Sequence, residues 1–134
     1  MATEAAQATT AWVREAMGPG VETRYGELAG PGDCCEVKAA PATPAVRRYA
    51  SGGGVYRFAY EVYLRVRPLG EGERLDGLGA LSALAARVEA GEVPGCGIEW
   101  ASHAVKSLPC LFRVEQGGEA VYQMAAELTY IVRS

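Results

Sequence analysis

The chain has 134 residues, of which 49 % are hydrophobic and 22 % charged, a composition that excludes a disordered chain and favours one globular domain. Thirteen basic residues against sixteen acidic ones give a formal net charge of -3, which argues against general nucleic-acid binding, because such domains usually carry a basic surplus. The first residues lack the basic start and apolar core of a secretory signal, so we expect residues 1–134 to form a single domain made and kept in a cytoplasm.

The chain begins with a predicted amphipathic helix over residues 3–17, for which Thr3 can serve as the N-cap. Its apolar residues recur at helical spacing and form one stripe: Ala5, Ala8, Trp12, Val13 and Ala16. Gly18-Pro19-Gly20 ends this helix, since glycine accepts the left-handed conformation at a helix C-terminus and proline cannot continue the helix. Three short extended segments follow, at residues 21–24, 34–40 and 45–50.

The segment 55–66 carries the strongest pattern, an almost unbroken alternation of apolar and polar residues. One face holds Tyr56, Phe58, Tyr60, Val62, Leu64 and Val66. Successive side chains on a strand point to opposite faces, so this alternation predicts one long strand buried on one side only. A strand in the middle of a parallel sheet would be apolar on both faces, and we therefore expect a mainly antiparallel sheet.

The second half of the chain contains another helix and more strands. The helix spans residues 73–90, and its predicted buried stripe is Leu75, Leu78, Leu81, Leu84, Ala85 and Val88. Gly77 and Gly79 are unfavourable inside a helix, so either they permit close packing of its backbone or the helix starts later than residue 73. Two further strands are expected at residues 97–106 and 110–114, separated by Pro109, and a last strand at residues 120–132. The predicted fold class is α+β, with two helices packed on one face of the sheet.

The polar face of the long strand carries Arg57, Glu61 and Arg65, and Arg67 continues it. Three interpretations remain open: a solvated charged face, a subunit interface, or, with Arg47 and Arg48, a phosphate-binding patch. The chain has few lysines beside many arginines, and arginine is enriched at interfaces, which favours a contact surface. We identify Arg57, Glu61, Arg65 and Arg67 as the candidate interface residues and expect charge reversal on this exposed face to leave the fold intact.

No catalytic, cofactor-binding or metal-binding motif accompanies this pattern. The four cysteines, Cys34, Cys35, Cys96 and Cys110, match no zinc spacing, and His103 is the only histidine. We interpret the cysteines as plain thiols, mostly buried, and His103 as a half-buried strand residue that is not a catalytic base. The sequence thus predicts no enzyme, no cofactor and no metal.

The order of these features resembles the small tail-terminator and minor capsid proteins of long-tailed bacteriophages and prophages. The resemblance covers nearly the whole chain and lies in five features. They are the helix with Trp12, Pro41-x-x-Pro44 leading through Arg47-Arg48-Tyr49, the long strand, the leucine-striped helix, and Ile98-Glu99-Trp100 before the last strand. What the resemblance implies is a non-enzymatic virion structural protein of the tail or neck. It would form a ring, commonly a hexamer, that caps the tail tube, stops its polymerisation and joins it to the head connector.

Two alternatives stay open from the sequence. One is a small-molecule-binding α+β domain or minor enzyme, which would show a sizeable apolar pocket with a few convergent polar groups. The other is a different neck or connector protein of the virion. In the virion interpretation, the partners are other copies of the chain, the tail-tube protein and the head connector. The protein would then reside in the host cytoplasm during assembly and in the virion afterwards.

Overall fold

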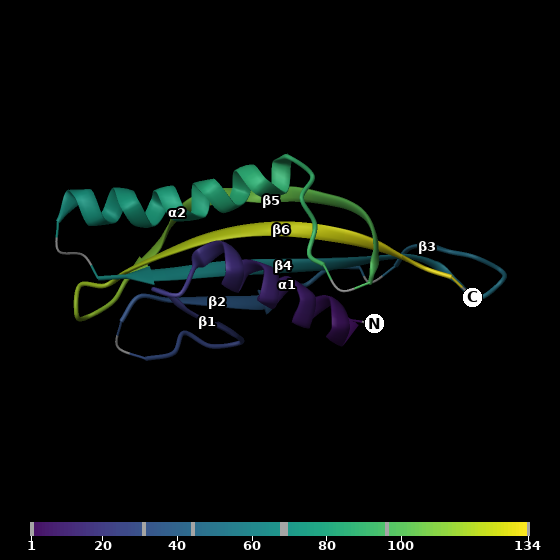
Figure 1. Cartoon of the computed structure of the whole chain (residues 1–134), viewed down its shortest axis with the longest axis horizontal. Coiled ribbons are helices and arrows are strands. Elements are labelled where there is room, and N and C mark those ends of the chain that lie inside the picture. The colour runs from purple at the N-terminus through teal and green to yellow at the C-terminus, as the bar shows by residue number, and fades with distance from the viewer. Residues whose placement is uncertain (1, 31, 44, 68–69, 96, 134) are drawn as a thin grey trace.

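The computed structural model describes residues 2–30, 32–43, 45–67, 70–95 and 97–133, so Pro44 and Cys96 lie outside the described residues. The described chain folds into two helices and six strands (Figure 1). In chain order they are α1 (Ala2–Met17), β1 (Glu22–Tyr25), β2 (Cys34–Ala39), β3 (Ala45–Arg48), β4 (Gly54–Val66), α2 (Glu71–Glu89), β5 (Glu99–Val114) and β6 (Ala120–Val132). Helix α1 starts at Ala2, so Thr3 lies inside its first turn and is not the N-cap that the sequence suggested.

The strands form one sheet in the order β1-β2-β4-β6-β5, and β3 pairs with the first residues of β4. All pairs are antiparallel except β1 with β2, which confirms the predicted α+β class with a mainly antiparallel sheet. The central pair is β4 with β6, in unbroken register from Gly54 opposite Val132 to Val66 opposite Ala120. Residues Glu115 to Glu119 connect β5 to β6 in a tight hairpin.

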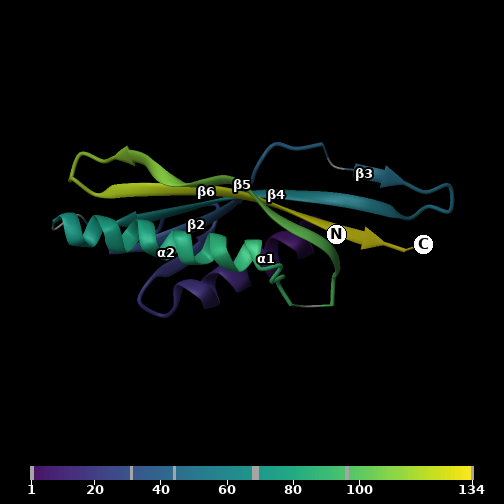
Figure 2. The same cartoon turned by 90° about the horizontal axis from the view of Figure 1, so that it is seen from above.

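Both helices cover the same face of the sheet (Figure 2), and the core lies between them and that face. We call this the inner face and the opposite one the outer face. The predicted core residues are confirmed: Tyr60, Val62 and Leu81 have no exposed surface, and Leu84 has 1 %. Leu64 and Tyr130 are also buried. The alternating pattern of β4 therefore identified the buried side of the strand correctly.

The strand at the far edge differs from its prediction. Residues 99–114 form one continuous strand, β5, and Pro109 does not divide it. Its pairing with β6 shifts register at four places: between Trp100 and Ser102, Val105 and Ser107, Ser107 and Cys110, and Leu111 and Arg113. Because each shift changes which side chains face the core, Trp100 and Val105 pack against it, whereas Ser102 and Ala104 are exposed. Proline is tolerated here because β5 is an edge strand.

Helix α2 buries only part of the leucine stripe that the sequence predicts. Leu81, Leu84, Ala85 and Val88 are buried, but Leu75 is 60 % exposed. Gly77 packs closely on the sheet: a Cβ at this position would lie 3.0 Å from Val66 Cγ2 and 3.1 Å from Tyr122 Cε2. Gly79 has no atom within 4 Å of the equivalent point. The predicted close backbone approach is thus confirmed at Gly77 and wrong at Gly79.

We predict that Leu84→Ala lowers the free energy of unfolding by about 2–5 kcal/mol, because it removes buried methyl groups and leaves a cavity. The matched control is Leu75→Ala on the same helix, which should change stability by less than about 0.5 kcal/mol because Leu75 is exposed. Urea unfolding followed by circular dichroism measures both. Equal losses for the two variants would show that α2 is rotated from the position described.

The two glycines of α2 provide a second test. Gly79→Ala should stabilise the protein by about 0.5–1 kcal/mol, since alanine restricts the unfolded chain and meets no neighbour. Gly77→Ala forces the buried side chains of Val66 and Tyr122 to move, and overpacking typically costs about 1–3 kcal/mol. We therefore expect Gly77→Ala to be less stable than the wild type in the same unfolding assay. A Gly77→Ala protein as stable as Gly79→Ala would contradict the close packing.

Candidate functional site

The candidate interface residues lie where the sequence predicts them, on the outer face of β4 or just after it, but two of their charges are paired within the chain. Arg57 Nε lies 3.0 Å from Glu127 Oε1 on the neighbouring strand β6. Arg57 Nη1 also donates a hydrogen bond of 3.1 Å to the carbonyl of Thr43. Glu61 Oε2 accepts a hydrogen bond of 3.2 Å from Gln123 Nε2.

Arg65 connects two loops of the chain and is not a free surface charge. Its side chain is only 16 % exposed, and its guanidinium lies 3.7 Å from the carboxylate of Glu115 in the β5–β6 hairpin. Its Nη2 also donates to the carbonyl oxygen of Gly30, in the loop before β2. Reversing this charge would break contacts inside the protein, so the expected tolerance of the fold to Arg65→Glu is not supported. Arg67 is exposed at the end of the strand, and its backbone nitrogen donates to Asp33 Oδ1 at 3.3 Å.

The arginines of β4 do not converge on one point. Arg57 and Arg65 are eight residues apart on one straight strand, which separates them by roughly 26 Å at about 3.3 Å per residue. A phosphate group needs its donors within hydrogen-bonding distance of one another. The phosphate-binding interpretation of this row of arginines therefore has no geometric support, whereas an extended contact surface remains compatible with it.

The centre of the outer face is an aromatic and polar cluster around Tyr63. Its hydroxyl accepts a hydrogen bond of 2.9 Å from Gln123 Nε2, and Lys38 Nζ lies 5.0 Å from its ring centre. Phe112, from the edge strand β5, meets the Tyr63 ring edge-on with the ring centres 5.2 Å apart. Tyr63 itself is 6 % exposed, but Phe112 is 46 % exposed. Exposed aromatic side chains beside charged groups are typical of protein contact surfaces.

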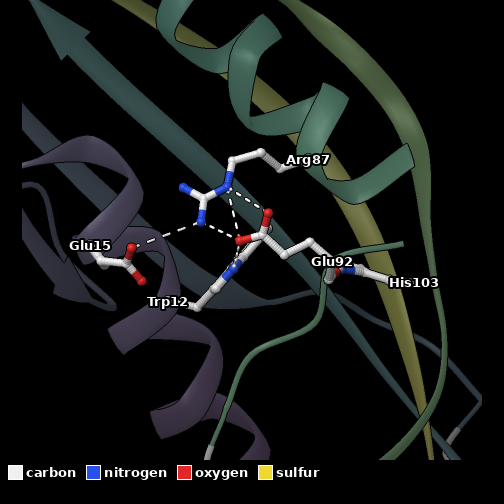
Figure 3. Close-up of polar contacts among 5 residues, drawn as sticks. All are labelled: Trp12, Glu15, Arg87, Glu92 and His103. Atoms are coloured by element: carbon white, nitrogen blue, oxygen red, sulfur yellow. Dashed lines mark hydrogen bonds and ion pairs between the residues drawn. The ribbon is translucent and has the colours of Figure 1, made fainter. Parts of the chain in front are cut away.

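A second polar cluster lies between the helices and β5, and the sequence identified only two of its members (Figure 3). Trp12 Nε1 donates to Glu92 Oε1 at 2.9 Å, and Arg87 Nε lies 3.0 Å from both carboxylate oxygens of Glu92. Glu15 of α1 lies 4.0 Å from the same guanidinium. The hydrogen bonds from Arg87 and Trp12 lower the pKa of Glu92 to about 2. This cluster ties α1 to the loop that follows α2.

His103 extends the cluster into the sheet. Its Nδ1 lies 2.7 Å from the backbone carbonyl of Glu92, and its Nε2 lies 2.7 Å from the hydroxyl of Tyr60. A carbonyl can only accept, so Nδ1 carries the proton and Nε2 accepts from the Tyr60 hydroxyl. The Trp12 ring meets the imidazole edge-on at 5.3 Å. Both nitrogens are therefore occupied, which confirms the prediction of a half-buried strand histidine and leaves neither nitrogen open to act as a base.

Three of the four cysteines lie in the described residues. Cys34 and Cys35 are buried on β2, and burial raises the pKa of Cys35 to about 12. Cys110 is exposed on β5, so two of the three described cysteines are buried as expected and Cys110 is not. Among the described residues, no group of three or more histidine, cysteine, aspartate or glutamate side chains could hold a metal ion, and no helix is long and apolar enough to cross a membrane.

Two apolar hollows flank helix α1. The larger lies beside Phe58 and Tyr25, has a volume of about 590 Å³, and is lined mainly by the N-terminal half of α1. The other, of about 540 Å³, lies between the C-terminal end of α1 and the N-terminal half of α2. We call this second hollow the acidic cleft, because its apolar floor is bordered by the carboxylates of Asp33, Glu73 and Asp76. Both volumes fall in the range of pockets that bind ligands or side chains of a partner.

Comparison with known proteins indicates the fold. No protein-family model matches the chain, and no curated protein does. A chain in the structure of the virion of a native gene transfer agent particle is 16 % identical and matches with a TM-score of 0.51, over 98 % of this chain and 92 % of that chain. A second solved structure, whose name states no function, is 17 % identical with a TM-score of 0.52, over 99 % and 95 % of the two chains. At these identities the likeness establishes a shared fold, one that occurs in a gene transfer agent virion.

The polar cluster predicts a pH dependence of stability. Burial lowers the pKa of His103 below its ordinary value, although the carbonyl and carboxylate of Glu92 oppose this effect. The folded protein therefore binds the imidazole proton less readily than the unfolded chain, and stability is lost as the pH falls below about 6.5. Protonated Nε2 would have to donate to the Tyr60 oxygen, which leaves the hydroxyl hydrogen of this fully buried tyrosine without its acceptor.

We predict that the wild type loses stability between pH 7.5 and pH 5.5 and that His103→Gln loses less over the same interval. His103 is the only histidine, and Glu92 stays ionised throughout because its pKa is about 2, so the difference between the two slopes reports His103. Urea unfolding at both pH values measures it. Parallel slopes for the two proteins would show that His103 titrates normally and that its bond to Tyr60 does not form.

Proposed function

We propose that this protein is a non-enzymatic structural component of a phage-like virion that caps the tail tube and joins the tail to the head. The single observation that carries the proposal is the fold correspondence over 98 % of the chain with a component of a gene transfer agent virion. The wide outer face, with its charged and aromatic residues, supports it as a contact surface. In this role the protein assembles in the host cytoplasm and ends in the tail or neck of the particle.

The proposed form is a ring of identical copies, commonly six. A single domain with two differing ends can associate head to tail, and such contacts close into a ring when the rotation between copies fits. In such a ring the helices of each copy lie on one side of its sheet and the outer face remains available to the tube or the connector. Electron microscopy of the protein bound to purified tail tubes tests this form directly.

The alternative, another neck or connector protein of the virion, is equally compatible with the fold correspondence. It differs from the terminator in the protein that it binds. Co-purification with the tail-tube protein alone supports the terminator, whereas co-purification with the head connector alone supports the connector role. The acidic cleft is the observation that favours the small-molecule alternative, since its volume is about 540 Å³. Protection of the protein against thermal unfolding by a small apolar cation would support that alternative.

We predict that exchanging one outer-face ion pair disables capping and leaves the fold intact. The double variant Arg57→Glu/Glu127→Arg keeps an ion pair inside the chain, so its stability should stay within about 1 kcal/mol of the wild type. Any partner charge facing either residue would now meet a like charge, which can cost several kcal/mol at an interface. The expected result is a folded protein that leaves tail tubes abnormally long in an assembly reaction viewed by electron microscopy.

The control is Glu89→Arg, an exposed charge reversal at the end of α2 on the opposite side of the sheet. Tubes of normal length are expected with this variant. Normal tubes with the Arg57/Glu127 exchange as well would remove Arg57 from the contact surface, and with it the assignment of the outer face to the tube.

A further inference from the structure

The β3–β4 hairpin projects from one end of the sheet, along the longest axis of the molecule (Figures 1 and 2). Its turn is closed by hydrogen bonds from Tyr49 N to Gly53 O at 2.8 Å and from Gly52 N to Tyr49 O at 3.0 Å. A Cβ on Gly54 would lie 2.4 Å from the carbonyl oxygen of Arg47, so the two strands approach too closely there for any other residue. The hairpin is therefore a well-defined arm.

This arm is basic and partly apolar. Residues 45–56 contain two arginines, Arg47 and Arg48, and no aspartate or glutamate. Arg47 and Arg48 are exposed, and so are the apolar side chains of Val46 and Tyr49, which are 48 % and 42 % exposed. Among the described residues, neither arginine side chain has a hydrogen bond or ion pair. The arm thus presents unpaired positive charge together with apolar surface.

The acidic cleft has the complementary character and lies toward the other end of the long axis, where α2 begins (Figure 1). Its floor is apolar, formed by Met17, Val21, Leu64 and Val66. Three carboxylates border it, those of Asp33, Glu73 and Asp76. Among the described residues that line it, Arg67 is the only arginine or lysine. Within the part of the chain that is described, the carboxylates of Glu73 and Asp76 form no ion pair.

We propose that the acidic cleft of one copy receives the hairpin residues Val46 to Tyr49 of a second copy. This inference rests on the proposed ring and names its subunit contact. The arm and the cleft lie at opposite ends of one molecule, so they cannot meet within a chain (Figure 1). Between copies, the contact is head to tail, which closes into a ring when the rotation between copies fits. Arginine and tyrosine inserted into a pocket are frequent anchors of protein interfaces.

The charges give this contact a direction. Arg47 and Arg48 supply guanidinium groups that can each bind a carboxylate through two hydrogen bonds, and the cleft offers Glu73 and Asp76. Val46 and Tyr49 would cover the apolar floor, which removes their exposed surface from water. A contact between two arms or between two clefts would instead bring like charges together, which disfavours a two-fold symmetric dimer.

Charge exchange tests the contact. The arm variant is Arg47→Glu/Arg48→Glu, the cleft variant is Glu73→Lys/Asp76→Lys, and a third chain carries all four substitutions. Association is measured by sedimentation velocity over a concentration series and by binding to purified tail tubes, with thermal melting as the check on folding. We expect the arm and cleft variants each to weaken association by at least about tenfold, and the chain with all four to recover to within about threefold of the wild type.

The matched control is Glu89→Lys, which changes a charge on α2 outside the cleft and should associate like the wild type. If the arm variant and the cleft variant both associate as tightly as the wild type, this inference is overturned, but the proposed ring is not. Weaker association of the cleft variant alone would mean that the cleft holds a different occupant, which also overturns it. A wild-type chain that associates neither with itself nor on tail tubes would contradict the proposed function as well.

Discussion

The pairing of β4 with β6 is the interaction on which the rest of this structure depends. Thirteen residues of each strand lie opposite one another, and their inner side chains, among them Val62, Leu64 and Met124, are the centre of the core. A slip of one residue would move every one of these side chains to the outer face. The register therefore determines at once which surface the helices cover and which charged residues stay outside. The strands β2 and β5 add to the two sides of this pair.

The same pair explains how much of the fold the sequence could predict. Alternation with period two is unambiguous in a long strand that is buried on one side, so the bounds of β4 and β6 and the inner face of β4 were predicted closely. Strand β5 was not, because register shifts change its periodicity and because an edge strand admits Pro109. Leu75 fits the helical stripe as well as Leu81 does, but it lies in the second turn of α2, where no residue of the sheet buries it. The position of β5 and Leu75 in the tertiary structure determines their pairing and burial, and a local sequence pattern does not carry that information.

The polar contacts were harder to predict than the core. Trp12 and Glu92 are eighty residues apart, and Tyr60 and His103 forty-three, so no spacing signals that they meet. The ion pairs of the outer face depend on the cross-strand register, which places Glu127 diagonally opposite Arg57. The sequence alone gives the charge of each residue but not the residue with which it pairs. The sequence therefore predicted correctly that the outer face is charged, but it could not tell that the charges of Arg57 and Arg65 are largely balanced inside the chain.

This internal pairing of charges distinguishes the outer face from the arm and the acidic cleft as surfaces for assembly. A partner of the outer face meets Arg57 and Arg65 with a carboxylate already beside each. Such a partner gains less from these arginines than from unpaired charges, although a like charge placed against them is still unfavourable, and it can also use exposed aromatic area such as Phe112. Arg47 and Arg48 of the arm and Glu73 and Asp76 of the acidic cleft form no ion pair in the described chain. In the proposed contact these groups would exchange water for ion pairs. The proposed ring therefore draws its specificity from the two ends of the molecule. The sheet between them, with the paired strands β4 and β6 at its centre, would set the distance and the angle at which those ends meet in successive copies.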